Sequence, residues 1–146
     1  MNEDKISATR LDQSADIGAL VLRIGFVATF FMHGLDKLRN GLGQGVQDLI
    51  RGGLPGELMY FSYISEVLAP ILISLGVLTR LSTLTVMATM ITIFVVLPFP
   101  AGLGVHGEWT FEVQLLYLVV ALALFFIGPG RYRVLPGGST RHWLLN

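Results

Sequence analysis

Long apolar runs dominate the pattern along this chain, and polar positions are confined to the ends and to short connections. A helix needs about 20 residues to cross roughly 30 Å of hydrocarbon, and an open chain in lipid satisfies its backbone hydrogen bonds only as a helix. Four runs approach this length, at residues 17–36, 58–78, 81–98 and 111–128. The pattern therefore predicts an all-α protein whose four helices cross a membrane as a bundle.

The connections between the runs predict their arrangement. Thr79 and Arg80 leave so short a link that the second and third helices should be antiparallel neighbours. The first connection is rich in glycine, so we expect no more than one or two amphipathic turns around residues 46–50. The third connection, residues 99–110, contains proline, glycine and tryptophan and is expected to be a loop at the membrane interface.

The distribution of positive charge predicts the orientation in the membrane. Both termini and the Thr79-Arg80 link share one side, which carries six lysines and arginines against three on the opposite side. The six are Lys5, Arg10, Arg80, Arg131, Arg133 and Arg141, and the three are Lys37, Arg39 and Arg51. Because cytoplasmic loops are enriched in Lys and Arg, we expect both termini in the cytoplasm and the protein in the bacterial inner membrane.

The predicted domain organisation is simple. Residues 1–16 form a polar N-terminal segment, residues 17–135 the transmembrane domain, and residues 136–146 a C-terminal tail. The N-terminal segment is acidic rather than basic, unlike a cleaved secretory signal, so the first run is expected to remain in the mature protein.

Composition narrows the function classes. The chain is 53% hydrophobic and only 14% charged, against about 25% charged in soluble domains. The net charge is zero and no basic stripe is present, which argues against nucleic-acid binding. Cysteine is absent, which excludes disulfides, thiolate metal sites and dithiol relays. Any redox chemistry therefore requires a bound cofactor or a partner protein.

Two ionisable residues lie well inside the apolar runs, where each costs about 2.5 to 3.5 kcal/mol on insertion scales. Arg23 is in the first run and Glu66 in the second, at depths that differ by about 9 Å. Because their long side chains can span this difference, we expect the two to interact directly or through a polar neighbour. Pro70 should kink the second helix and free the backbone carbonyl of Glu66.

Polar residues from three helices are expected on the outer half of the bundle, around a partly buried polar cavity. The candidate ligand-binding residues are Arg23, His33, Lys37, Glu66 and Glu112. Each also has a structural interpretation, because basic side chains near helix ends anchor at the interface and an acidic residue stabilises a helix N-terminus. His33, His106 and Glu112 are metal-ligand types, but their spacing matches no known pattern, so no metal site is assigned. No residue is assigned a catalytic role.

Several short motifs, each present once, follow one another between Leu20 and Leu135. They are Leu22-Arg23-Ile24, His33-Gly34 with Lys37, Ser65-Glu66, Leu75 to Arg80, Glu112 with Leu115 to Leu118, and Gly128 to Arg131. In order and spacing they resemble the DoxX family of small four-helix membrane proteins. The resemblance implies a link to membrane oxidoreductase assemblies, since the family is named from a subunit associated with thiosulfate:quinone oxidoreduction. Quinone is therefore the candidate ligand, although the lack of cysteine excludes the mechanism of thiol-based quinone reductases.

Three functions remain open from the sequence. The first is an auxiliary subunit of a membrane redox system that binds quinone or a similar small ligand in the outer cavity. The second is a small-molecule or proton carrier in which Glu66 changes protonation, which a discontinuous helix near Pro70 would favour. The third is a structural scaffold. The expected partners are the lipid bilayer and either a redox-complex subunit or further copies of the chain, and the sequence does not decide whether the protein is an enzyme.

Overall fold

The computed structural model describes residues 2–96 and 111–134, with side chains from residue 11 onward. This part of the chain is helical and contains no strand. The elements are α1 (Asn2–Asn40), α2 (Gly43–Arg51), the 3-10 helix η1 (Gly56–Tyr60), α3 (Phe61–Tyr63), the π-helix η2 (Ile64–Leu68), α4 (Ala69–Leu75), α5 (Thr79–Val96) and α6 (Glu112–Ile127). The prediction of an all-α protein is confirmed.

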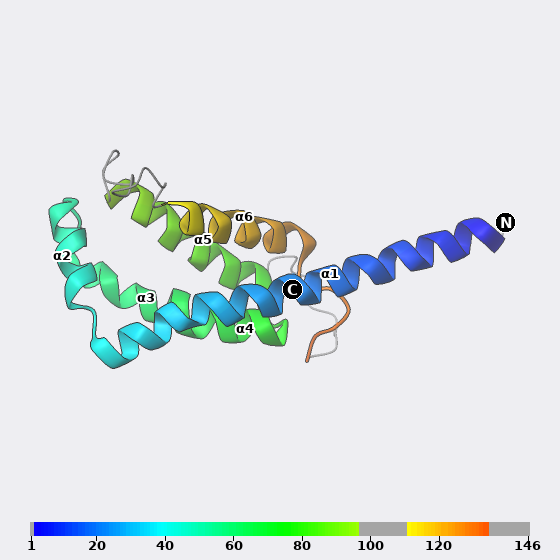
Figure 1. Ribbon diagram of the computed structural model, residues 1–146, viewed down its shortest axis with the longest axis horizontal. Helices are drawn as coiled ribbons and strands as arrows, with labels where there is room; N and C mark the ends of the chain where they lie inside the picture. The colour runs from blue at the N-terminus through cyan, green and yellow to red at the C-terminus, as the bar shows by residue number, and fades with distance from the viewer. Residues whose placement is uncertain (1, 97–110, 135–146) are drawn as a thin grey trace.

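Three stretches are long and apolar enough to cross a membrane, namely Leu11–Asn40, Gly56–Leu75 and Thr79–Val96, and α6 is a shorter apolar helix. α1 packs against α4, η2 and α6, while α5 packs against α6 and α4. Figure 1 shows these helices as an elongated bundle, with α2 across one end and the beginning of α1 projecting beyond the other. We refer to the end that carries α2 as the α2 end.

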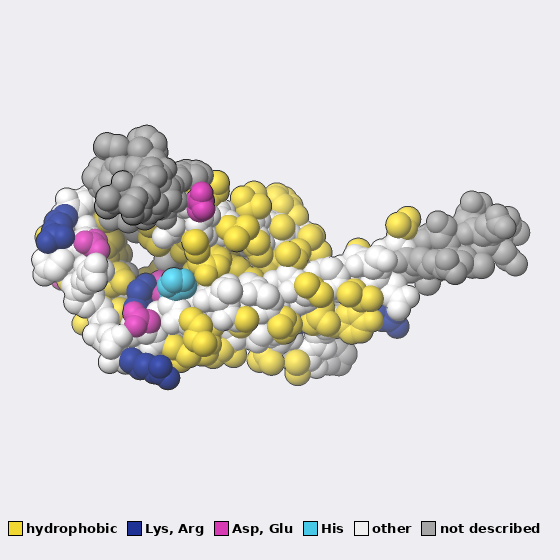
Figure 2. Space-filling model, in the orientation of Figure 1, with side chains coloured by type: hydrophobic (Ala, Val, Ile, Leu, Met, Phe, Trp, Pro, Cys, Tyr) yellow, Lys and Arg dark blue, Asp and Glu magenta, His cyan; other side chains and the backbone are white. Residues whose placement is uncertain are grey.

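The core of the bundle is formed by apolar side chains from α1, α4, α5 and α6. Its buried members are Phe26, Phe30, Ala69, Ile73, Val86, Met90, Tyr117, Ala121 and Leu124. Many other large apolar side chains are exposed around the middle of the bundle, while charged side chains gather mainly at the α2 end (Figure 2). This is the pattern expected when lipid surrounds the middle of the molecule.

The turn between α4 and α5 confirms the predicted antiparallel neighbours. Gly76 ends α4 with a φ of 70°, in the left-handed region where glycine has no steric penalty. The close contact of α4 with α5 follows from this short connection.

Two elements differ in detail from the sequence-based predictions. The glycine-rich first connection contains a full helix of nine residues, α2, rather than one or two turns. The second span contains a π-helical turn between α3 and α4, just before Pro70, where a kink was expected. The connection at 99–110, with His106, and the tail at 136–146 lie outside the described residues.

Candidate functional site

A buried ion pair joins α1 to the π-helix at the α2 end. Lys37, near the end of α1, donates a hydrogen bond from Nζ to Oε1 of Glu66. The Glu66 side chain is 3% exposed and the Lys37 side chain 23%. A carboxylate so deeply buried needs a charged partner, because its desolvation costs several kcal/mol. Lys37 supplies that partner within the described residues.

The π-helix places Glu66 against α1. Pro70 has no N–H, so it cannot donate to the Glu66 carbonyl four residues earlier as an α-helix would require. That carbonyl lies against Gly34 of α1, where an added Cβ would be only 2.3 Å from the oxygen. The absence of a side chain at Gly34 therefore allows α1 to approach the π-helix closely. π-helical turns inside longer helices occur often at functional sites.

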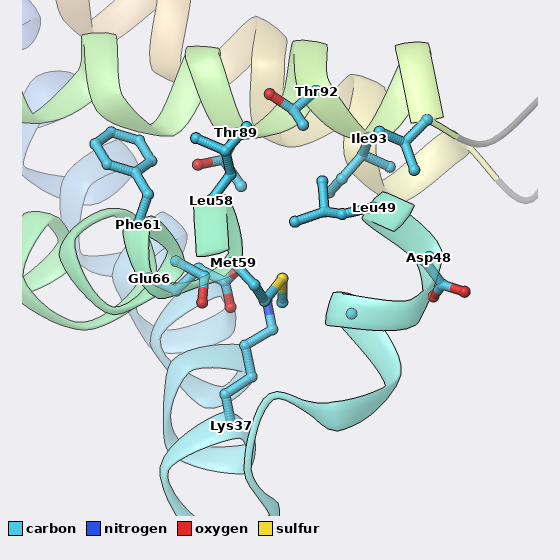
Figure 3. Close-up of a pocket in the computed structure, with 13 residues that line it drawn as sticks. Lys37, Asp48, Leu49, Leu58, Met59, Phe61, Glu66, Thr89, Thr92 and Ile93 are labelled. Carbon is cyan, nitrogen blue, oxygen red and sulfur yellow. The ribbon is translucent and has the colours of Figure 1, made fainter. Parts of the chain in front are cut away.

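Glu66 and Lys37 form the polar base of a cavity of about 220 Å³ (Figure 3). Its wall is contributed by α2, η1, α3 and α5. The other lining residues are Gly45, Asp48, Leu49, Leu58, Met59, Phe61, Ser62, Thr89, Thr92, Ile93 and Val96. Figure 3 shows the Lys37 side chain extended toward Glu66, with apolar side chains around the space and Asp48 at its edge. We call this space the larger cavity.

Two polar atoms at the base of the larger cavity are buried without a hydrogen-bond partner among the described residues. They are Oε2 of Glu66 and the hydroxyl of Ser62, one helical turn earlier. A buried polar group left unpaired costs about 1 to 3 kcal/mol, so native structures rarely keep one without a function. The two atoms are suited to a ligand that donates to a carboxylate and exchanges a hydrogen bond with a hydroxyl.

A second, smaller cavity of about 90 Å³ lies beside the first. It shares Lys37, Glu66 and Ile93 with the larger cavity, and its remaining lining residues are Phe30, His33, Met90, Val113, Gln114 and Tyr117. Nε2 of His33 lies 3.4 Å from the hydroxyl of Tyr117, and the two rings meet edge to face. We call this space the smaller cavity.

The predicted interaction between Arg23 and Glu66 is wrong. Arg23 is 1% exposed and donates to the backbone carbonyls of Ser74, Pro129 and Tyr132, at the end of the bundle opposite α2. It lies 14 positions before Lys37, or about 21 Å along α1. Arg23 therefore does not belong to the same site as Glu66, and its role in the described structure is to tie α1 to the end of α4 and to the chain that follows α6.

The segment that follows α6, residues 128–134, makes two further hydrogen bonds at the same end of the bundle. The N–H of Arg131 donates to Oδ1 of Asp16 at 2.8 Å, and the N–H of Val134 donates to the carbonyl of Leu75 at 3.0 Å. We call residues 128–134 the closing segment.

We expect Arg23→Lys to lower the free energy of unfolding by roughly 2 kcal/mol. A single ammonium cannot reproduce the planar fork that reaches three carbonyls, and hydrogen bonds to charged groups are worth about 1.5 to 3 kcal/mol. Denaturation of the purified protein in mixed micelles, followed by circular dichroism, measures the change. Arg39→Lys at an exposed position of α1 is the control and should shift stability by less than about 0.5 kcal/mol. Equal stability of the two variants would contradict the assigned role.

The structure brings together three of the five predicted site residues. Glu66 and Lys37 border both cavities, and His33 borders the smaller one. Glu112 is exposed at the first turn of α6 and borders neither cavity, which fits its alternative role at a helix N-terminus. No group of three metal-ligating side chains occurs among the described residues.

Sequence reasoning missed Ser62, Gln114 and Tyr117. Ser62 lies four residues before Glu66, and Tyr117 lies three residues after Gln114, so helical periodicity places each pair on one face. That spacing was the signal that could have identified them. Arg80, which counts in the sequence-based prediction only as a charge in the second connection, donates from Nε to the carbonyl of Phe125 at 2.9 Å, near the end of α6.

Comparisons with known proteins agree with this architecture. A family model described as DoxX matches residues 18–98, which hold α1 from Gly18 onward, α2, the second span with its π-helical turn, and α5. The chain is 31% identical over 118 residues to a Bacillus subtilis (strain 168) protein named "putative oxidoreductase CatD". That alignment covers 78% of this chain and 83% of the relative. No solved structure matches the chain.

Proposed function

This chain belongs to the DoxX family of membrane proteins, and on that premise we propose that it is an auxiliary subunit of a membrane redox system. The larger cavity holds the ring of a quinone or a similarly small amphipathic ligand. The protein acts in the bacterial inner membrane with its termini in the cytoplasm, where a partner subunit supplies electrons. The Bacillus subtilis relative is named as an oxidoreductase, and this name supports the redox assignment.

The observation that carries the proposal is the buried Glu66 carboxylate, with one oxygen unpaired among the described residues, at the base of a cavity whose lining surface is mostly apolar. A quinone ring has apolar faces and two carbonyl oxygens, and on reduction to the quinol it takes up electrons and protons and becomes a hydrogen-bond donor. Lys37 and Ser62 are donors suited to the carbonyl oxygens. Glu66 is an acceptor suited to a quinol hydroxyl. The base of the cavity therefore has partners for both forms of the ligand.

The size of the larger cavity limits the part of the ligand that it holds. Pockets for drug-sized molecules usually measure about 300 to 1,000 Å³, whereas this one is about 220 Å³. A single substituted ring fits this space, and a long hydrocarbon tail must remain outside.

The walls of the larger cavity allow such a tail to reach lipid. Leu58 and Phe61 line the cavity and are also 51% and 39% exposed on the outer surface. They face α5, which packs mainly on α4, η2 and α6 rather than on η1 or α3. Figure 1 shows α3 and α5 spreading apart toward α2. A ligand dissolved in the bilayer can therefore enter sideways, between η1–α3 and α5.

We expect Thr89→Trp to abolish ligand retention, because an indole at this position fills the larger cavity. The test purifies the protein in native-lipid particles and measures extracted quinone by absorption. Bound quinone should fall at least about tenfold, since the ring loses both its space and its hydrogen bonds. Ile91→Trp, on the same helix but 54% exposed, is the matched control and should retain quinone.

Two results would refute quinone binding. One is wild-type protein that carries no quinone and takes up none when decylubiquinone is added to the particles. The other is equal quinone in the Thr89→Trp and Ile91→Trp proteins.

The variant Glu66→Gln should weaken decylubiquinol binding by about tenfold, because a hydrogen bond to a charged acceptor is replaced by one to a neutral amide.

A small-molecule or proton carrier that uses Glu66 is the second candidate, favoured by the π-helical turn that contains this residue. π-helical turns occur often at functional sites, carboxylates at membrane depth commonly take part in proton transfer, and here the π-helix contains the buried carboxylate. Proteoliposomes with a trapped pH-sensitive dye separate the two candidates. A carrier would collapse an imposed pH gradient in the wild type and not in Glu66→Gln, whereas a redox subunit would leave the gradient intact in both.

A further inference from the structure

The Lys37–Glu66 ion pair forms part of the wall between the two cavities. Both residues, together with Ile93, line the larger and the smaller cavity. The chemistry on the two sides differs. Most of the surface that lines the larger cavity is apolar, while the lining of the smaller cavity, a space of about 90 Å³, has a larger polar share and includes His33, Gln114 and Tyr117. The buried carboxylate therefore lies between an apolar compartment and a polar one.

The smaller cavity has the properties of a hydrated space. Oε1 of Gln114 and Oε2 of Glu66 are both buried without a partner among the described residues, and both residues line this cavity. A cavity needs about 10 to 15 Å³ and two to four polar partners to hold one water, so this one has room and partners for more than one. Water donating to these two oxygens removes the cost of leaving them unpaired.

His33 connects the smaller cavity to the surface. Its side chain is exposed on the outside of α1, yet its Nε2 lies 3.4 Å from the buried Tyr117 hydroxyl inside. The Tyr117 ring is held edge to face by Phe26 and Phe30, so its hydroxyl has a fixed position. Because an imidazole can both accept and donate a proton, a histidine at this position can relay protons between the surface and the polar cavity.

We propose that the smaller cavity is a proton inlet that links outer water to Glu66. A proton leaves a water or the His33 imidazolium, crosses the water of the cavity and forms an O–H bond at Oε2 of Glu66. The carboxylate becomes neutral, Lys37 keeps its ammonium, and the donor regains a proton from bulk water. No electron moves in this step. Tyr117 acts as a positioning residue for His33.

The role of this inlet rests on the proposed function, because the reduction of a quinone in the larger cavity consumes protons that the inlet would supply. The arrangement separates two routes to one carboxylate. The ligand arrives from lipid through the larger cavity, and the proton arrives from water through the smaller one. The existence of the inlet does not depend on the identity of the ligand, so it can be tested without one.

The test uses the absence of cysteine, which makes any introduced thiol the only one in the protein. Ile93→Cys places a thiol on both cavities and keeps the ion pair, and Glu66→Cys places one at the carboxylate itself. Each protein is reconstituted in liposomes and treated with silver ions, which remain in water and react with thiolates. The remaining thiol is then counted with a fluorescent maleimide after denaturation.

Three added tryptophans identify the route that silver takes. Gln114→Trp fills the smaller cavity, Thr92→Trp fills the larger one, and Leu115→Trp is an outward control on the same helix as Gln114. We expect Gln114→Trp to slow silver modification of both thiols at least about tenfold, because a filled cavity admits no water to ionise them. The other two tryptophans should change the rate less than about twofold.

Several outcomes would overturn the inlet. One is that silver does not modify the thiols of Ile93→Cys or Glu66→Cys in the absence of an added tryptophan. Another is that Thr92→Trp slows silver modification as much as Gln114→Trp or more. The third is that Gln114→Trp does not change the modification rate. If Gln114→Trp elutes as an aggregate, Val113→Trp, which also lines the smaller cavity, takes its place. If Glu66→Cys does not fold, the Ile93→Cys result decides. Quinone retention is measured separately, so a protein with the inlet but no quinone would refute the proposed function alone.

Discussion

Lys37→Leu is expected to lower the free energy of unfolding by about 3 to 5 kcal/mol, the largest effect of any substitution considered for this chain. The change leaves the Glu66 carboxylate, which is 3% exposed, without its cation. That carboxylate must then either stay charged in a medium of low polarity or take up a proton. Both cost stability relative to the paired state.

The double variant Lys37→Leu/Glu66→Leu should recover most of this loss, because no charge is then left buried. Unfolding in mixed micelles, followed by circular dichroism, gives the free energy for each variant. Arg39→Leu, at an exposed position near Lys37, should change stability by less than about 0.5 kcal/mol. If the double variant were as unstable as Lys37→Leu alone, the ion pair would not be the cause.

Gly34→Ala is expected to cost about 3 kcal/mol, the upper part of the usual range for overpacking. The new Cβ would lie 2.3 Å from the carbonyl oxygen and 2.7 Å from the carbonyl carbon of Glu66. Backbone atoms cannot rotate away as a flexible side chain can, so α1 must separate from the π-helix. This movement would also separate Lys37 from Glu66.

Gly25→Ala is the matched control for Gly34→Ala. It lies on the same helix, and an added Cβ there has nothing within 4 Å. This substitution should be neutral or raise stability by up to about 1 kcal/mol, because alanine favours helix more than glycine does. The measurement is again unfolding in mixed micelles. Similar stabilities for the two alanine variants would show that α1 and the π-helix do not pack closely.

The fold was largely predictable because the lipid solvent imposes a strong pattern. Long apolar runs separated by polar or glycine-rich connections define the helices. The short link between the second and third helices, predicted at Thr79-Arg80 and found at residues 76–78, allows only antiparallel neighbours. α2 was underestimated for a physical reason. Glycine disfavours helix by about 1 kcal/mol per residue. However, the Leu49 side chain of α2 is buried against the bundle, and such tertiary packing overrides the local preference.

The candidate site was only partly predictable. Glu66 stands out because charges at membrane depth are rare, whereas Lys37 lies just beyond the first apolar run, and the pairing of the two was not predicted. Arg23 was paired with Glu66 because the two were the most deeply placed charges. Its actual partners are backbone carbonyls, which every residue carries, so no sequence pattern marks them. The unpaired Ser62 hydroxyl likewise depends on where η2 and α5 place their side chains.

The closing segment has a consequence for biosynthesis. Arg23 leaves the ribosome more than 100 residues before two of its three acceptors, the carbonyls of Pro129 and Tyr132. Until those carbonyls arrive, its guanidinium must be kept hydrated or chaperoned at the insertion machinery. Completion of the bundle is thus postponed until residues 128–134 have been made, and a chain truncated after α6 would leave the Arg23 guanidinium with only the Ser74 carbonyl of its three acceptors.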